Sequence, residues 1–410
     1  MLQVFAIIAS VLLIIAIFQD AFEAIILPRR VTQRFRLSRQ FYTSTWLLWS
    51  WGARKMRTGN RREFYLGYFG PLSLIVLLIL WAVLLILGFA LLQWGMVSLL
   101  NVPEKQVTFG TYLYMSGVTF ITLGFGDVVP LSGMGRLVAV LEAGTGFGFL
   151  ALIIGYIPVI YQVFSRRETH IALLDARAGS PPSATELLRR QYRDQRSEDF
   201  VQYLQGWEQW CAQVLESHLS YPVLTYYRSQ HERQSWLAAL TAILDTCALL
   251  ITGFENVSLP NARYTFAIAR HAAVDLAQNY GTPPLNSGRN RLSSADFARM
   301  RDALEQVGLR LHYPQDAEAR LAEIRLIYEP FVTALADHLM VNLPPWITAT
   351  RTVDDWQTSA WDHFAQWSPE KIEEITHIIV DHRKKAPVHH NGMHTQEEPS
   401  VLDGSEKKSG

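Results

Sequence analysis

The stretch Thr108-Phe-Gly-Thr-Tyr-Leu-Tyr-Met-Ser-Gly-Val-Thr-Phe-Ile-Thr-Leu-Gly-Phe-Gly-Asp-Val-Val-Pro130 decides the fold predicted for this chain. It is moderately apolar, yet it is too short to cross a bilayer and return as two helices. A short helix from about Phe109 to Phe120, followed by an extended segment, would suit a re-entrant loop. Non-helical backbone at membrane depth is tolerated only where protein buries it or where it lines a water-filled path. The stretch therefore predicts such a loop.

Three long uncharged stretches accompany this segment. They are residues 1–19, the run between Glu63 and Glu104, and the run from Ala143 to Ser165. About 20 apolar residues span the hydrocarbon core, so each stretch predicts a transmembrane helix. The first could instead be a signal peptide, but it lacks a basic start and a small-residue cleavage site before Asp20. A retained helix is therefore expected.

The charges of the chain are divided unevenly. Its 37 Lys and Arg balance its 37 Asp and Glu, so the total gives no support for a nucleic-acid partner. Residues 1–165 hold 12 basic and 6 acidic groups, whereas residues 166–410 hold 25 and 31. Ten of the basic residues lie between Pro28 and Tyr65, and the positive-inside rule places that loop in the cytoplasm. The predicted topology in the cell membrane has the N-terminus outside and the C-terminal half in the cytoplasm.

The basic loop has two interpretations. Five aromatic residues lie among its arginines, as in an interfacial helix that touches anionic lipid: Phe41, Tyr42, Trp46, Trp49 and Trp51. The alternative is a topology signal with a linker along the headgroups. Asp20 and Glu23, on one face near the end of the first helix, are predicted to pair with Arg29 or Arg30.

The segment Thr122-Leu-Gly-Phe-Gly-Asp127 resembles the selectivity filter of potassium channels, and the resemblance extends over roughly Leu72 to Phe164. Dehydrated cations need rings of carbonyl oxygens aimed at one axis, and Gly124 and Gly126 can adopt the positive φ that turns successive carbonyls the same way. The resemblance implies K⁺ at the backbone carbonyls of Thr122, Leu123, Gly124 and Phe125, with the Thr122 hydroxyl as a further oxygen ring.

The resemblance also assigns residues around the filter. Phe125 stands where many members carry Tyr and is expected to point into the surrounding protein, while Asp127 is expected behind the outer mouth. Tyr114, eight residues before Thr122, occupies an aromatic position from which it could bond Asp127. Val118 stands where some relatives carry glutamate, which leaves Asp127 one fewer possible partner.

The third apolar stretch corresponds to the pore-lining inner helix of this family. Gly146 lies 19 residues after Asp127, at the family's hinge position, with Gly144 and Gly148 beside it. Close packing through small residues is the alternative explanation of these glycines. Glu142 is an acid in an apolar helix, and it could attract cations into a cavity or brace the filter from behind.

The chain contains a single filter motif, whereas a ring around an axis needs four, so a homotetramer is expected. The link from Asn101 to Val107 is too short for the extracellular cap that is typical of two-pore-domain channels. A two-pore chain is therefore excluded.

The polar half predicts a helical domain. Ser183-Ala-Thr-Glu186 is a capping box that opens a helix through Arg193, and Ser294 is expected to cap a helix with Phe297 on its apolar face. Cys211 and Cys247 give no disulfide framework. The segments Glu216–Pro222 and His231–Trp236 are dense in function-capable residues, and buried polar groups between helices are expected there more than a ligand or metal site.

Together these patterns predict an all-α membrane protein with a potassium-channel-like pore module and a helical cytoplasmic domain. The expected segments are a first transmembrane helix (1–27), a basic cytoplasmic or interfacial linker (28–65), the pore module (66–165), the helical domain (166–385) and a disordered tail (386–410). No enzyme motif or cofactor site is predicted.

The predicted function is a homotetrameric potassium-selective channel gated by its helical domain, through a stimulus or ligand that the sequence does not name. Two alternatives stay open. Leu123 and Val118 could loosen the filter and give a weakly selective cation channel. The chain could also be a non-conducting membrane-anchored sensor whose helical domain binds a partner.

Overall fold

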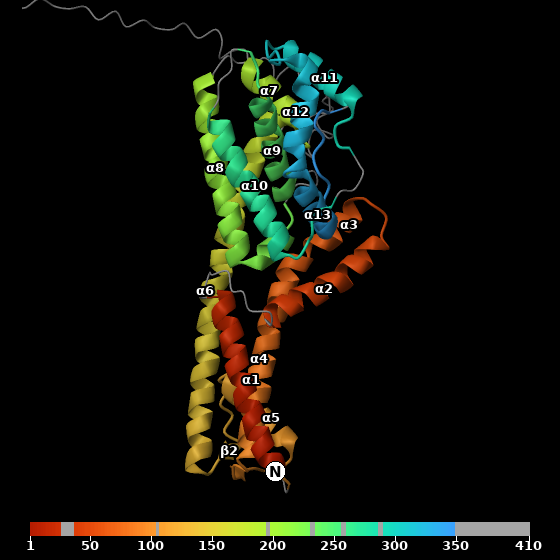
Figure 1. Ribbon diagram of the computed structural model, residues 1–410. Helices are drawn as coiled ribbons and strands as arrows, with labels where there is room; N and C mark the ends of the chain where they lie inside the picture. The colour runs from red at the N-terminus through yellow and green to blue at the C-terminus, as the bar shows by residue number, and fades with distance from the viewer. Residues whose placement is uncertain are drawn as a thin grey trace, which may run out of the picture. The chain divides into compact units, whose positions relative to one another are not determined.

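The computed structural model describes residues 1–25, 37–103, 106–193, 197–229, 234–255, 260–285 and 290–348 (Figure 1). Within these ranges the chain is almost entirely helical, as predicted. The first elements are α1 (Leu2–Ile25), α2 (Leu37–Arg54), α3 (Asn60–Gly67), α4 (Phe69–Gly95), β1 (Leu100–Asn101), α5 (Phe109–Phe120), β2 (Val129–Pro130) and α6 (Gly133–Ala178). The polar half adds α7 (Ala184–Arg193), α8 (Ser197–Ser220), the 3₁₀ helix η1 (Pro222–Tyr226), α9 (Trp236–Thr252), α10 (Asn261–Asn279), α11 (Ser294–Glu305), α12 (Pro314–Leu326) and α13 (Glu329–Leu339).

Three stretches of helix are long and apolar enough to cross a membrane, which confirms the three predicted spans. They are Leu2–Ile25, Asn60–Gly95 and Gly133–Ala178. Two glycines of α4 permit α1 to pack closely along it. A Cβ at Gly88 would lie 2.8 Å from Ile14 Cγ1, and one at Gly95 would lie 2.9 Å from Ile7 Cγ1. Small residues at such contacts let two helix backbones approach each other.

The predicted re-entrant loop lies between α4 and α6. Its helix α5 has the predicted bounds, and a capping box between Thr108 and Thr111 opens it. The antiparallel pair β1–β2, with Leu100 opposite Pro130, closes the two ends of the loop. The Tyr112 hydroxyl donates to the Ser98 carbonyl at 2.8 Å, so α5 is anchored to the end of α4.

The pore-lining candidate α6 is longer than the sequence pattern predicts. It runs without a break through residue 165, where the pore module was expected to end, and reaches Ala178 in the helical domain. Pro158 lies inside α6 and has no N–H to donate, so one backbone hydrogen bond of the helix is missing there. One helix therefore belongs to both the loop-bearing region and the polar domain, and motion in either can reach the other along it.

The helical domain is built around α9. Nearly all of its side chains are buried, as expected for a helix that is apolar on every side. Only half of the predicted capping box is seen. The Ser183 hydroxyl accepts from the Glu186 N–H at 3.3 Å, but the Ser183 N–H donates to the Ala178 carbonyl and the Glu186 carboxylate pairs with Arg189 and Arg190 instead. The cap of α11 is Ser293 rather than Ser294, because the Ser293 hydroxyl accepts from the Asp296 N–H. Phe297, on α11, is buried as predicted.

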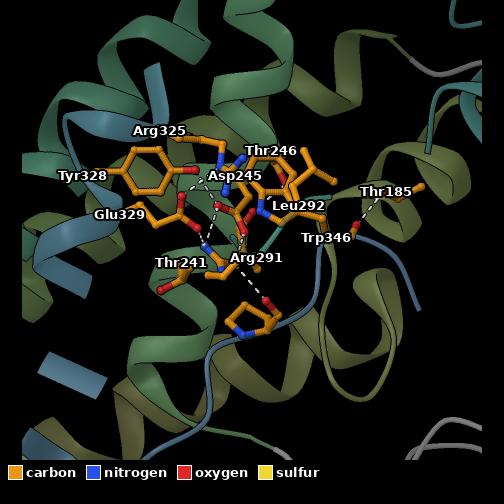
Figure 2. A network of polar contacts seen from close by, with 12 residues as sticks. Thr185, Thr241, Asp245, Thr246, Arg291, Leu292, Arg325, Tyr328, Glu329 and Trp346 are labelled. Carbon is orange, nitrogen blue, oxygen red and sulfur yellow. Dashed lines mark hydrogen bonds and ion pairs between the residues drawn. The ribbon is translucent and has the colours of Figure 1, made fainter. Parts of the chain in front are cut away.

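Asp245, the one acid on α9, forms a network with two arginines (Figure 2). Its carboxylate accepts from Arg291 and from the Tyr328 hydroxyl, both at 2.6 Å, and Glu329 bonds Arg291 and Arg325. Two acids thus balance two cations, and burial of such a network is tolerated because its partners are present. The network cross-links α9, α12, α13 and the loop before α11, and its charges are balanced within it.

The predicted pairing of Asp20 and Glu23 with Arg29 or Arg30 stays a prediction. Arg29 and Arg30 lie outside the described residues. Asp20 itself is buried and accepts from the Ser38 N–H and hydroxyl at 3.0–3.2 Å and from Trp81 Nε1 at 2.9 Å. This carboxylate therefore joins α1, the first turn of α2 and α4.

The predicted tail at 386–410 and the C-terminal part of the 166–385 domain, from residue 349 on, also lie outside the described residues.

Candidate ion pathway

The backbone φ angles of the predicted filter alternate in sign. Thr122, Gly124 and Gly126 have positive φ values of 59°, 63° and 75°, while Leu123 and Phe125 between them do not. The two glycines were predicted to take this conformation, whereas Thr122 was not. A β-branched residue with positive φ is a backbone outlier, and such outliers concentrate at functional sites. This alternation is suited to turning successive carbonyls toward one side.

The pore helix α5 leads directly into this segment. Its last turn is closed by the Leu123 N–H, which donates to the Val118 carbonyl at 2.9 Å. The C-terminal end of a helix carries partial negative charge, so the end of α5 favours a cation near the start of the filter. Val118 thus contributes through its backbone, and its side chain supplies no acid.

The outer end of the filter has the bond expected from the resemblance. The Tyr114 hydroxyl donates to Asp127 Oδ2 at 2.8 Å, across 13 residues of chain. This contact ties the pore helix to the residue that follows Gly126.

Glu142 and Gly146 lie one turn apart on α6 and face Ser116 and Phe120, which lie one turn apart on α5. Glu142 is fully buried and accepts from the Ser116 hydroxyl, which also contacts the Ile86 carbonyl at 2.8 Å. A Cβ on Gly146 would lie 1.8 Å from the Phe120 carbonyl oxygen. Of the two roles open to Glu142, this burial favours bracing of the pore helix over display in a cavity. Close packing alone accounts for Gly146, and a hinge there stays a prediction.

A single chain leaves the filter uncovered. Residues 121–127 are all exposed, and 67% of the Phe125 side chain is accessible, although it was expected to point into surrounding protein. Val140, Phe147 and Ile154 on α6 are also exposed. An axial ring of carbonyls requires further copies of the chain, whereas lipid or further copies can cover the apolar groups of α6.

A contact that the sequence did not predict joins α6 to the helical domain. Buried Arg167 of α6 donates to the Leu224 carbonyl at 2.9 Å and to the Tyr227 carbonyl at 2.8 Å. At the start of α4, a Cβ on Gly70 would lie 2.6 Å from the Tyr227 ring. The segment from η1 to Tyr227 therefore contacts both helices that flank the loop. The pair Arg166–Arg167 directly after the third apolar stretch was the only available signal.

The segment Glu216–Pro222, which is rich in polar and titratable residues, contains a buried polar contact, as expected. His218 is fully buried, its Nε2 lies 3.2 Å from Arg167 Nη1, and its Nδ1 lies 2.8 Å from the Val214 carbonyl. Burial and the neighbouring Arg167 charge lower the pKa of His218 well below its usual value. Among the described residues, no group of three or more His, Cys, Asp or Glu could hold a metal ion. His231 lies outside those residues.

Comparison with known proteins addresses the loop region directly. Residues 74–162 match the model of a family described as ion channel. Residues 74–162 are an ion channel module. The match confirms the resemblance noted in the sequence and agrees with the three membrane-spanning candidates.

Two relatives match parts of the chain. An uncharacterized membrane protein of Bacillus subtilis, YdjJ, is 24% identical over 217 residues, which are 52% of this chain and 62% of that protein. A "putative potassium channel protein" of Rhodopseudomonas palustris is 37% identical over 67 residues, 16% of each chain. The matches thus span less than two thirds of the length of either relative. No solved structure matches the chain.

Proposed function

We propose that this ion channel module conducts K⁺ selectively through a homotetrameric pore with the filter Thr122–Asp127. The observation that carries the proposal is the alternating backbone of this filter, with positive φ at Thr122, Gly124 and Gly126 directly after a pore helix. Four copies would bring the carbonyls of Thr122, Leu123, Gly124 and Phe125 to one axis, where they replace the hydration shell of the ion. The likeness to a relative named as a putative potassium channel points the same way.

The membrane orientation is part of the proposal. The ten basic residues between the first two spans favour a cytoplasmic location for that loop, with the spans in the cell membrane. The N-terminus is then outside and the filter opens outward. The helical domain lies in the cytoplasm, where its contact with α6 through Arg167 allows it to influence the pore.

A weakly selective cation channel is the second candidate. It is favoured by the outer filter, where the exposed Asp127 accepts from the Tyr114 hydroxyl and Val118 offers no acid nearby. Fewer bonds behind a filter would let its carbonyls adapt to ions of different size. The two candidates differ in the ratio of K⁺ to Na⁺ permeability.

The experiment is an ion flux assay on purified protein in liposomes, with Gly124→Ala as the variant. Alanine at φ 63° costs about 1–2 kcal/mol in each subunit, so K⁺ flux is expected to fall to background while the assembled protein is retained. Gly281→Ala is the matched control, since Gly281 has φ 65°, has no side-chain neighbour within 4 Å and lies in the helical domain. Equal K⁺ flux in wild type and Gly124→Ala would overturn the filter assignment.

A further inference from the structure

Helix α2 has one side that the rest of the described chain leaves uncovered. Leu47, Leu48 and Trp51 are 63%, 73% and 62% exposed, and their spacing puts them on the same side of the helix. Tyr42 and Trp46, on the opposite side, are buried. Two of the five aromatic residues of the basic loop are thus covered by protein, and the uncovered side is the apolar surface to explain.

Both ends of α2 are held by the membrane-spanning helices. At its start, Asp20 near the end of α1 accepts from the Ser38 N–H and hydroxyl. At its end, Trp49 Nε1 donates to the Tyr65 carbonyl at 3.1 Å, and the two rings stack at 4.5 Å just before α4 begins. A helix fixed between the same-side ends of two spanning helices lies at the boundary of the bilayer.

Exposed cations continue this surface beyond the C-terminal end of α2. They are Arg54, Lys55, Arg57 and Arg61. The Lys55 ammonium lies 3.4 Å from the centre of the Trp51 ring. Within the described part of the chain, the nearby acid Glu63 pairs with Arg62 and Arg228 instead. These four cations can therefore bind an anion from outside the protein.

We propose that the surface formed by Leu47, Leu48, Trp51 and these four cations docks on an anionic lipid leaflet. The leucines and the indole enter the boundary between headgroups and acyl chains, and the cations face lipid phosphates. Apolar insertion with basic neighbours is the combination that binds interfacial helices to anionic membranes.

A short chain of contacts connects the docked side of α2 to the pore helices. On its buried side, Trp46 lies 4.9 Å from the Tyr226 ring of η1 and 4.9 Å from the Phe69 ring of α4, measured between ring centres. Arg167 of α6 holds the carbonyls on either side of Tyr226. If the module conducts K⁺ as proposed above, its flux depends on the anionic lipid content of the leaflet through these contacts.

The docking test uses a fluorophore on an introduced cysteine and needs no ion flux. Cys211 and Cys247 are fully buried, so Leu48→Cys offers the one accessible thiol of the described chain. Leu326→Cys on α12, 69% exposed in wild type, is the matched control. In vesicles of phosphatidylcholine with phosphatidylglycerol, quencher-bearing lipid is expected to quench the label at 48 and to leave the label at 326 unaffected.

A label at 48 that only a water-soluble quencher reaches would overturn the docking. So would a label shielded from both quenchers, because protein would then cover this side of α2.

The anionic preference is tested by charge removal. Arg57→Gln with Arg61→Gln is expected to reduce quenching at position 48 by phosphatidylglycerol-borne quencher at least twofold and to remove any dependence of K⁺ flux on phosphatidylglycerol. Arg263→Gln with Arg310→Gln, two exposed arginines of the helical domain, is the control and is expected to change neither. Equal quenching at position 48 in pure phosphatidylcholine and in the mixture would overturn the anionic preference. Quenching as expected in a protein without flux would keep the docking and reject the proposed function.

Discussion

At the scale of single residues, the carboxylate of Glu142 links two helices of the membrane-spanning region. It is fully buried and accepts from Ser116 on the pore helix, while its second oxygen, Oε2, has no hydrogen-bond partner. A buried acid is tolerated only while a partner satisfies it. Its placement makes the position of α5 depend on α6.

We therefore expect Glu142→Gln to be milder than Ser116→Ala. The amide oxygen of Gln still accepts from Ser116, whereas the Ala variant leaves the acid without its described donor, at a cost of about 1–3 kcal/mol. The midpoint of thermal unfolding of the solubilised assembly measures this. A larger loss in Glu142→Gln would contradict the bracing role.

Gly146 offers a second test at the residue scale. Gly146→Ala places a methyl group 1.8 Å from the Phe120 carbonyl, whereas Gly144→Ala meets nothing within 4 Å in the same chain. Gly146→Ala is expected to lower assembly yield severalfold, and Gly144→Ala to leave it near wild type. A well-assembled Gly146→Ala protein with altered flux would instead support the hinge.

At the scale of elements, η1 joins the helical domain to the pore helices. The carbonyls of Leu224, within η1, and of Tyr227, directly after it, accept from Arg167, and His218 lies against the same guanidinium. A neutral His218 suits this geometry, since Nδ1–H can donate to Val214 while Nε2 accepts from Arg167. A protonated ring would place two positive groups in contact.

This arrangement predicts a loss of stability in acid. The pKa of His218 is lowered by burial and by Arg167, so below about pH 6.5 the unfolded chain binds a proton that the folded chain does not. The free energy of unfolding then falls as the pH drops, by up to about 1.4 kcal/mol per pH unit. Thermal unfolding at pH 7.5 and 5.5 should show a smaller difference for His218→Gln than for wild type. An equal difference would rule out this role for His218.

Local patterns at this scale were predictable, and long-range contacts were not. The bounds of α5 follow from its capping threonines and from the glycines after it, and the Ser183 cap of α7 depends on four adjacent residues. The cap of α11 was wrong by one residue because Ser293 and Ser294 are equally suitable in sequence. Arg167 contacts residues 57 and 60 positions away, and no local spacing encodes that pairing.

For the whole molecule, the exposed filter needs further copies to form a pore, while the exposed apolar side of α6 can be covered by those copies or by lipid. Four copies around one axis would cover Phe125 and Phe147, which one chain leaves open. Native mass measurement of the solubilised protein is expected to give four times the chain mass of 46.7 kDa. A monomer or a dimer would contradict the proposed pore.

The uneven division of charge between the two halves of the sequence corresponds to two parts of the structure. Four exposed cations of the described basic segment lie at the end of α2 and in the residues up to Arg61, and the acidic excess belongs to the half that contains α7 to α13. The sequence predicted the three spans because hydropathy alone determines them. It could not predict that α6 continues into the polar domain, since the apolar pattern ends near Ser165 while the helix does not.

The most direct test of the central claim is the reversal potential of the reconstituted channel with K⁺ on one side of a bilayer and Na⁺ on the other. A filter made of the Thr122–Phe125 carbonyls predicts a reversal potential displaced strongly in the direction of K⁺ selectivity, by about 59 mV for each tenfold preference. A reversal potential near zero at equal concentrations of the two salts would contradict potassium selectivity.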